Sequence, residues 1–441
     1  MKIQTPPGMR DFYPEEMRLQ NWLFDHWRAV SRSFGFVEYE APIFEFTELY
    51  TLKSGDELTS QAFRVSRAGN EEAKYAIRPE MTPSLARMVA ARANALPRPI
   101  KWFSIPRMCR AERPQRGRLR EFFQWNVDLL GVEDAIADAE VIAVAVEFLK
   151  RVGVTPDEVV VRVSSRPLAT AFLASLGILV ERNADAFALI DKLDRLPPVE
   201  FAQQWNAAFG AALAADRARD LFEKSDFDEV LAGASGSGEA GVAAAGQFRT
   251  LWAHLEQLGI AAYCKFDLKV VRGLAYYTGP VFEVYPRKLT LRALMGGGRY
   301  DSLTALLDGP KLPAVGFGMG DVTVVEFLRE LGRLPTLGEQ LDVFVIDADE
   351  KFFPSVLEIA GKLRAANLAV DFSYKRQAVG KQFKQASSRG ARFTVVVGQE
   401  YEQGGQLVIK DMSAGSQTSI GAEAFLANPM AHLGDHTAGH T

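Results

Sequence analysis

Hydrophobic and polar positions alternate with two different periods near the start of the chain. Apolar residues recur every three or four positions over 22–34, which predicts an amphipathic helix. The helix is expected to begin at Pro14 and to end at Gly35, because proline favours the first turn of a helix and glycine its end. Residues 36–39 are rich in β-forming side chains and predict a short strand before Pro42.

Two apolar strands are predicted on either side of an arginine-rich connection. Residues 100–112 and 122–131 form the strands, and the polar segment 113–121 joins them as a long hairpin loop. Along the second strand the apolar residues Phe123, Trp125, Val127 and Leu129 alternate with the polar residues Gln124, Asn126 and Asp128. The polar row either lines a pocket or faces solvent on an antiparallel sheet, and the pattern leaves both interpretations open.

The middle of the chain changes from strands to helices and back. A helix is predicted over 135–153 and a strand over 158–165. The pattern from 167 to 259 is helical and resembles an insertion, broken by a glycine- and serine-rich segment, 233–246, that is expected to be flexible. Strands resume over 265–285.

Glycines alternate along one later strand. Gly316, Gly318 and Gly320 all point to the same side of this strand, and Asp321 follows where the N-cap of a helix is expected. A strand face without side chains that ends at a helix N-terminus would admit a flat or anionic group. Close packing between helix and strand explains the pattern equally well.

The last hundred residues predict a separate domain. Residues 331–340 have the composition of a linker, and strands and helices alternate over 341–427, which is typical of a compact α/β domain. We expect a first domain over 1–330 and a disordered tail over 428–441. The predicted fold class is therefore α/β, with two domains.

The amino-acid composition limits which functions this protein can have. The net charge of −4 makes any contact with nucleic acid local, and the two cysteines, Cys109 and Cys264, fit neither a disulfide framework nor a zinc ribbon. Only five histidines are present, so histidine-based catalysis or metal binding is not expected. There is no phosphate-loop motif, no secretory signal and no apolar run long enough to cross a bilayer, and we expect a cytoplasmic protein.

Positive charge is concentrated in the hairpin connection. Residues 109–123 contain five arginines: Arg110, Arg113, Arg116, Arg118 and Arg120. Arginines on the strands could hold a nucleotide triphosphate while those at the loop tip reach a nucleic-acid end; a solvated surface loop is the simpler alternative. Arg110 and Glu112 share one face of the first strand, so the glutamate could orient the arginine toward a carboxylate or phosphate.

Several segments together carry a family resemblance. They are GMRDFYPEE (8–16), GFVEYEAPIFE (35–45), AIRPEMT (76–82), CRAERPQRGRLREFFQWNVDLLG (109–131), VRGLAYYTGPVFE (271–283), LMGGGRYDSL (294–303) and AVGFGMG (314–320). The chain resembles class II aminoacyl-tRNA synthetases, and within that class the histidyl-tRNA synthetases. The resemblance covers nearly the whole chain, and its most specific segments are VRGLAYYTGPVFE and RPQRGR.

The resemblance implies a fold and an activity. The fold would be an antiparallel-sheet catalytic domain with a helical insertion at about 167–259, followed by a C-terminal α/β anticodon-binding domain. The activity would be that of an aminoacyl-tRNA ligase, which forms histidyl-adenylate from L-histidine and ATP and then transfers histidine to the 3′ end of tRNA(His). Mg²⁺ would accompany the ATP phosphates, and the protein would be a homodimer with no membrane contact. Fixed arginines and Mg²⁺ suit a reaction in which negative charge grows on phosphate oxygens.

The resemblance also implies site residues. Three arginines would be catalytic: Arg110, Arg118 and Arg272. The histidine-binding residues would be Glu80, Met81, Thr82, Arg110, Gln124, Asp128, Arg272, Tyr276, Tyr277 and Tyr300. The ATP-binding residues would be Arg110, Glu112, Arg118, Phe122, Gly318 and Gly320. The tRNA acceptor end would meet Arg113, Gln115 and Arg116. No metal would be held by the protein alone.

Three positions depart from the family pattern. Asp128 and Ala275 stand where the family often has glutamate and an acid, respectively. More importantly, Thr323 occupies the position in the first turn of the last catalytic helix where the class normally has an arginine. Binding of ATP there must then differ, be weaker, or use another arginine such as Arg299.

Two alternatives compete with a synthetase. A non-catalytic, histidine-sensing paralogue, the regulatory subunit of ATP phosphoribosyltransferase, would explain Thr323, but such paralogues generally lack an anticodon-binding domain. An RNA-binding α/β protein without catalysis would explain the arginine loop but not the glycine strand.

Overall fold

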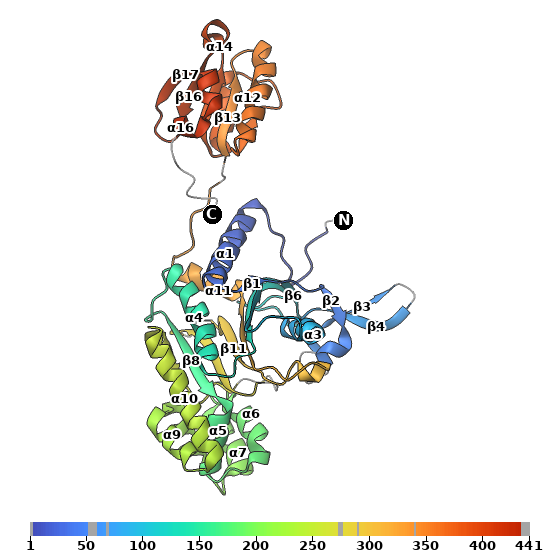
Figure 1. Ribbon diagram of the computed structural model, residues 1–441, viewed down its shortest axis with the longest axis vertical. Helices are drawn as coiled ribbons and strands as arrows, with labels where there is room; N and C mark the ends of the chain where they lie inside the picture. The colour runs from blue at the N-terminus through green and yellow to red at the C-terminus, as the bar shows by residue number, and fades with distance from the viewer. Residues whose placement is uncertain are drawn as a thin grey trace. The chain divides into compact units, whose positions relative to one another are not determined.

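The computed structural model describes residues 3–51, 60–67, 70–271, 277–288, 291–338 and 341–433. Contacts divide the chain into two units, Met1–Pro335 and Thr336–Thr441 (Figure 1). The predicted residues Arg272 and Tyr276 lie outside the described part of the chain, as does Ala275. Within the described residues, no helix is long and apolar enough to cross a membrane.

The first unit is built on a large, mostly antiparallel sheet. Its described strands follow the order β1-β5-β7-β12-β11-β10-β8-β9, and β6 also pairs with β7. Only the β1–β5 and β8–β9 pairs are parallel. The strands are β1 (Val37–Glu38), β5 (Ile100–Ser104), β6 (Arg107–Cys109), β7 (Glu121–Leu130), β8 (Val159–Ser165), β9 (Cys264–Phe266), β10 (Pro280–Pro286), β11 (Met295–Arg299) and β12 (Ala314–Gly320).

Helices cover the apolar side of the central strands. α1 (Pro14–Ser33) packs on α4 (Ile136–Arg151), and α4 contacts both β7 and β12. The rings of Trp27 and Trp125 stack with centroids 5.7 Å apart. The indole N–H of Trp125 donates to the Ser31 hydroxyl at 3.0 Å, so burial leaves this polar atom paired. The apolar row predicted on β7 therefore faces the hydrophobic core.

The predicted hairpin differs in two details. Its first strand ends at Cys109, so Arg110 and Glu112 follow the strand and do not share a face of it. The first strand is divided into β5 and β6, because Pro106 interrupts it, and both pieces pair antiparallel with β7. α11 (Asp321–Glu330) follows the glycine strand β12 as expected. A small second sheet, β2 (Phe44–Phe46), β3 (Phe63–Arg67) and β4 (Asn70–Ile77), precedes α3 (Thr82–Arg92).

The helical insertion contains six α-helices among the described residues (Figure 1). They are α5 (Arg166–Ser175), α6 (Asn183–Ile190), α7 (Pro198–Phe209), α8 (Ala215–Lys224), α9 (Phe227–Ser235) and α10 (Glu239–Gln257). The prediction of a flexible segment over 233–246 is wrong, since only 236–238 lie between α9 and α10. The glycines serve close packing instead: a Cβ on Gly241 would lie 1.9 Å from the Ala234 carbonyl oxygen, and one on Gly233 would lie 2.8 Å from the Phe172 ring.

The second unit is an α/β domain with the sheet order β14-β13-β15-β16-β17. Its strands are β13 (Leu341–Asp347), β14 (Val370–Phe372), β15 (Ala391–Val397), β16 (Gln406–Asp411) and β17 (Gln417–Gly421). Its helices are α12 (Phe353–Ala365), α13 (Val379–Ser388), α14 (Gln399–Gly404), α15 (Ala422–Ala427) and α16 (Pro429–Leu433). α16 corrects the prediction of disorder from residue 428, because Leu433 is buried in the core of this unit. Residues 434–441 lie outside the described part.

Candidate active site

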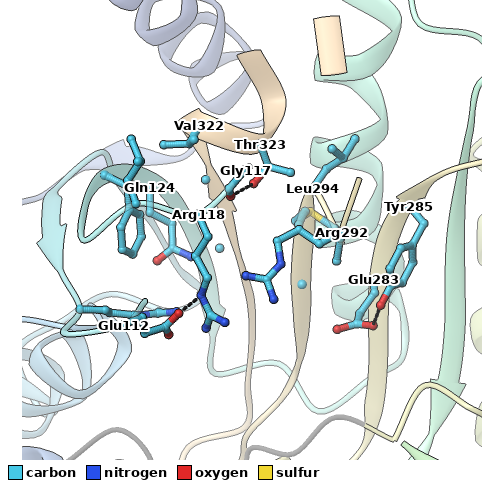
Figure 2. Close-up of a pocket in the computed structure, with 18 of the residues that line it drawn as sticks. Glu112, Gly117, Arg118, Gln124, Glu283, Tyr285, Arg292, Leu294, Val322 and Thr323 are labelled. Atoms are coloured by element: carbon cyan, nitrogen blue, oxygen red, sulfur yellow. Dashed lines mark hydrogen bonds and ion pairs between the residues drawn. The ribbon is translucent and has the colours of Figure 1, made fainter. Parts of the chain in front are cut away.

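A cavity of about 520 Å³ opens at the end of β12, where α11 begins. One wall is the arginine-rich connection between β6 and β7, and the opposite wall comes from β10 and the residues before β11 (Figure 2). The predicted ATP-binding residues all line it: Arg110, Glu112, Arg118, Phe122, Gly318 and Gly320. Gln124 of the polar row lines it as well, so this end of the row faces a cavity.

The arginines of the connection are held in defined positions. Arg110 donates from Nε to the Pro79 carbonyl at 2.9 Å, and its guanidinium carbon lies 5.2 Å from the centroid of the Phe122 ring. Glu112 forms an ion pair with Arg118, which corrects the expectation that it orients Arg110. The geometry fixes two cations on one wall.

The N-terminal segment supports this wall from behind. The Gly8 carbonyl accepts the backbone N–H of Arg120 at 2.9 Å, and Gly8 has a positive φ of 83°, which favours glycine. Arg10 forms a 2.7 Å ion pair with Asp321, whose carboxylate also accepts the Phe123 N–H at 2.9 Å. Asp321 is therefore the first residue of α11 and a cross-link rather than the predicted N-cap, which is Gly320. Burial raises the pKa of Asp321, and Arg10 opposes that shift.

The glycine strand makes room for polar side chains of β7. Gly316 pairs with Asp128 in the β7–β12 register. A Cβ on Gly316 would lie 2.1 Å from Asp128 Oδ1, and one on Gly318 would lie 2.3 Å from Gln124 Nε2. Gly316 also approaches the Val127 carbonyl and thus requires glycine, whereas at Gly318 the flexible Gln124 amide could move, and a Cβ on Gly320 would meet nothing within 4 Å.

A buried polar cluster surrounds Asp128, which is 2% exposed. The Tyr300 hydroxyl donates to its carboxylate. Burial, and next the negative charge of Asp128, raise the pKa of both Tyr300 and Tyr39 above the usual value, so both hydroxyls stay protonated. Tyr277 is also buried here, against Gly298, where a Cβ would lie 2.8 Å from its ring. Asn126 and Asp128 of this row are therefore enclosed, whereas Gln124 faces the cavity.

The segment before α3 is placed next to the same strands. Glu80 is 7% exposed, and Thr82 is the first residue of α3. The Met81 side chain is fully buried and packs with Ala41 and Met108. Met81 thus contributes to the core, and its side chain does not line the cavity.

At the tip of the arginine-rich loop, some polar side chains are exposed to solvent and others contact the rest of the protein. Arg113 and Gln115 are exposed. Arg116 forms an ion pair with Glu330 of α11, so it belongs to the support of the loop as well as to its surface. The Thr323 hydroxyl donates to the Gly117 carbonyl at 3.1 Å, which joins the loop to the first turn of α11 (Figure 2).

Arg299 does not replace the arginine expected at Thr323. It is 6% exposed, and its guanidinium contacts Asp138 at 2.6 Å and the Val132 carbonyl at 3.0 Å. It does not line the cavity. Its role is to hold α4 to the end of β11, which corrects the suggestion that it binds ATP.

Four polar side chains of the cavity were not predicted: Arg195, Glu283, Tyr285 and Arg292. Arg195 comes from the helical insertion, between α6 and α7, and Arg292 precedes β11. Glu283 lies within the segment VRGLAYYTGPVFE, so that motif could have indicated it. For Arg195 and Arg292 no sequence signal was available, because only the folded chain brings them beside Arg110.

Comparison with known proteins agrees with this geometry. A family model described as histidyl-tRNA synthetase matches residues 8–323. This chain belongs to the histidyl-tRNA synthetase family. A second model, described as an anticodon binding domain, matches residues 342–428.

Relatives of this family align along nearly the whole chain. A histidine–tRNA ligase of Opitutus terrae is 38% identical over 430 residues, covering 96% of this chain and 97% of the relative. A chloroplastic/mitochondrial histidine–tRNA ligase of Arabidopsis thaliana is 37% identical, covering 95% of this chain and 85% of the relative. The crystal structure of histidyl-tRNA synthetase from Nostoc sp. PCC 7120 superposes with a TM-score of 0.80 at 25% identity, covering 98% of this chain and 100% of that one.

Proposed function

We propose that this protein is a histidine–tRNA ligase, which activates L-histidine with ATP and transfers it to tRNA(His). An arginine-lined cavity that adjoins a buried carboxylate, in a chain of this family, supports the proposal most directly. The first step joins a histidine carboxylate oxygen to the α-phosphorus of ATP, while the bond to the β-phosphate breaks and pyrophosphate leaves. In the second step a terminal hydroxyl of tRNA replaces AMP.

Adenylate formation requires stabilisation of charge more than a general base. Arg110 would bind the α-phosphate and the histidine carboxylate, with Phe122 beneath it available to stack on adenine. Arg118 would bind phosphate from the same wall, oriented by Glu112. The predicted catalytic role of Arg272 concerns a residue outside the described part of the chain.

The cluster around Asp128 suits an imidazole ligand. Imidazole offers one N–H donor and one nitrogen acceptor, and a buried carboxylate beside protonated tyrosines can meet both. Tyr277 would close the pocket, and Gln124 would line its mouth. Glu80 and Thr82 would receive the α-amino group, as their positions at the start of α3 allow.

Mg²⁺ would arrive with the triphosphate. Magnesium bound to ATP needs only one or two protein carboxylates. Glu112 and Glu283 line the cavity, which fits that requirement, and no group of three or more His, Cys, Asp or Glu side chains within the described ranges could hold a metal alone. Both carboxylates already have a partner, because Glu112 is paired with Arg118 and Glu283 accepts the Tyr285 hydroxyl at 2.8 Å. When bound, Mg²⁺ would neutralise charge on the departing pyrophosphate.

The tRNA would meet both units. Arg113, Gln115 and Arg116 are exposed and would bind the acceptor end. In the second unit, Tyr374 is 77% exposed beside Lys375 and Lys384 around a shallow hollow, a combination suited to stacking a base and binding phosphate.

A homodimer is supported by exposed apolar side chains on β2 and β4, including Phe44, Phe46 and Tyr75.

A histidine-sensing paralogue is the second candidate, and Thr323 favours it. A crystal structure from Bacillus halodurans, named as an ATP phosphoribosyltransferase regulatory subunit/histidyl-tRNA synthetase, superposes with a TM-score of 0.71 at 26% identity, covering 90% of this chain and 97% of that one. The arginine-lined cavity and the match to an anticodon binding domain favour the ligase. The deciding experiment is charging of a tRNA(His) transcript with labelled histidine. A folded protein that binds histidine but charges no tRNA would support the sensor.

A further inference from the structure

The first turn of α11 brings no cation to the cavity. Thr323 stands where the class has an arginine, and its hydroxyl is bonded to Gly117. The neighbouring Asp321 is buried and paired with Arg10, which points its charge away from a ligand. The bound triphosphate therefore needs a positive charge from another element at this end of the sheet.

Strand pairing brings one arginine to that end. β11 runs antiparallel to β12, with Met295 opposite Met319 and Gly296 opposite Gly318. The residues just before β11 thus lie beside the residues just after β12, where α11 begins. Arg292 precedes β11 by three positions and lines the same cavity as Thr323. Figure 2 shows its guanidinium directed into the cavity, toward the space that Arg118 also faces.

The surroundings of Arg292 are positively charged. Arg292 is exposed toward the open cavity; partial desolvation, with the like charges of Arg110 and Arg195, lowers its pKa from the usual value, and Tyr285 opposes the shift. Within the residues that the structure describes, no carboxylate lies within ion-pair distance of its guanidinium, in contrast to Arg118 with Glu112. An arginine stays charged at neutral pH, so a bound polyanion would relieve the repulsion among these cations.

We propose that Arg292 binds the β- and γ-phosphates of ATP and thereby replaces the arginine that is missing at Thr323. Arg110 serves the α-phosphate, and the guanidinium of Arg292 forms the opposite side of the phosphate site. Because these phosphates leave as pyrophosphate, Arg292 also stabilises the charge that grows on the leaving group. This assignment rests on the proposed adenylate-forming reaction and names a residue of its ATP site.

The test distinguishes binding of the β- and γ-phosphates of ATP from binding of the rest of the ATP molecule. Arg292→Ala should weaken binding of ATP and of pyrophosphate by about 10- to 100-fold, the loss expected for one charge-assisted contact. AMP affinity, and the KM for histidine in ATP–pyrophosphate exchange, should stay within about threefold of the unmodified protein. Arg292→Lys keeps the charge without the forked donors and should fall between the two. Arg287→Ala is the matched control, since Arg287 follows β10 but bonds the Pro156 carbonyl outside the cavity.

A second variant tests the replacement itself. In the Arg292→Ala background, Thr323→Arg returns a guanidinium to the cavity from α11 and should recover at least tenfold of the lost ATP affinity. Calorimetric titration measures binding without turnover, and circular dichroism confirms folding of each variant. Equal loss of AMP and ATP affinity in Arg292→Ala, or unchanged affinity for both, would overturn the assignment. Absence of histidine-dependent exchange in the unmodified protein would instead refute the proposed function.

Discussion

The glycine strand gives a prediction whose size follows from the geometry. In Gly316→Ala the new Cβ would lie 2.1 Å from Asp128 Oδ1 and 2.7 Å from the Val127 carbonyl oxygen. Both contacts are shorter than 3.0 Å, so the Asp128 side chain must shift and the β7 backbone beside it must give way as well. Forcing a methyl group into a packed site costs about 1–3 kcal/mol.

That cost should appear in two measurements. The free energy of unfolding should fall by about 1–3 kcal/mol in a urea titration. Histidine affinity, measured by calorimetry without ATP, should fall by roughly 5- to 150-fold if the same energy is lost from the histidine site. Both effects have one cause, the displacement of Asp128 from its position beside Tyr300.

A control lies on the same face of the same strand. In Gly320→Ala the new Cβ would meet nothing within 4 Å, so stability and histidine affinity should stay as they are. Because Gly320 lines the cavity, any effect of this variant should fall on ATP. The reasoning would be refuted if Gly316→Ala bound histidine within twofold of the unmodified protein and unfolded with the same free energy.

Three other variants test separate parts of the account. Asp128→Asn replaces a charged acceptor by an amide and should raise the KM for histidine by about 10- to 100-fold, with the KM for ATP unchanged; an unchanged KM for histidine would remove Asp128 from the pocket. Arg113→Ala should slow transfer to tRNA about tenfold in single-turnover assays while ATP–pyrophosphate exchange continues; a loss of exchange would place Arg113 at adenylate formation instead. Arg299→Ala leaves Asp138 buried without its cation and should cost about 3–5 kcal/mol of unfolding free energy in urea; a loss below about 1 kcal/mol would contradict the structural role of this pair.

Periodicity and turn chemistry predicted the main elements of the fold. α1, the antiparallel pairing of β5 and β6 with β7, the glycine strand and the alternating C-terminal unit all follow from local patterns. The glycines at 233–246 misled the prediction, because the same residue type that loosens a linker also lets two helices pack closely. Sequence alone does not distinguish these uses, since the contact partner Phe172 lies far away along the chain.

The motifs indicated where a cavity lies, and the roles of its residues stay predictions. Residues of the arginine-rich connection line one wall of this cavity. The pairing of Glu112 with Arg118, and the cross-link from Arg10 to Asp321, depend on how the loop closes and on an N-terminal segment that packs behind it. Arg292 escaped prediction because only the pairing of β11 with β12 brings it to the cavity that Thr323 also lines.

Histidine-dependent ATP–pyrophosphate exchange, with Mg²⁺ and without tRNA, tests the central claim most directly. The account predicts exchange with L-histidine and none with the other amino acids, because Asp128 and the tyrosines select an imidazole while the arginines bind the triphosphate. Such a result would also show that Thr323 does not prevent the use of ATP. A folded protein that binds histidine but supports no exchange would contradict the account and would identify the protein as a histidine sensor.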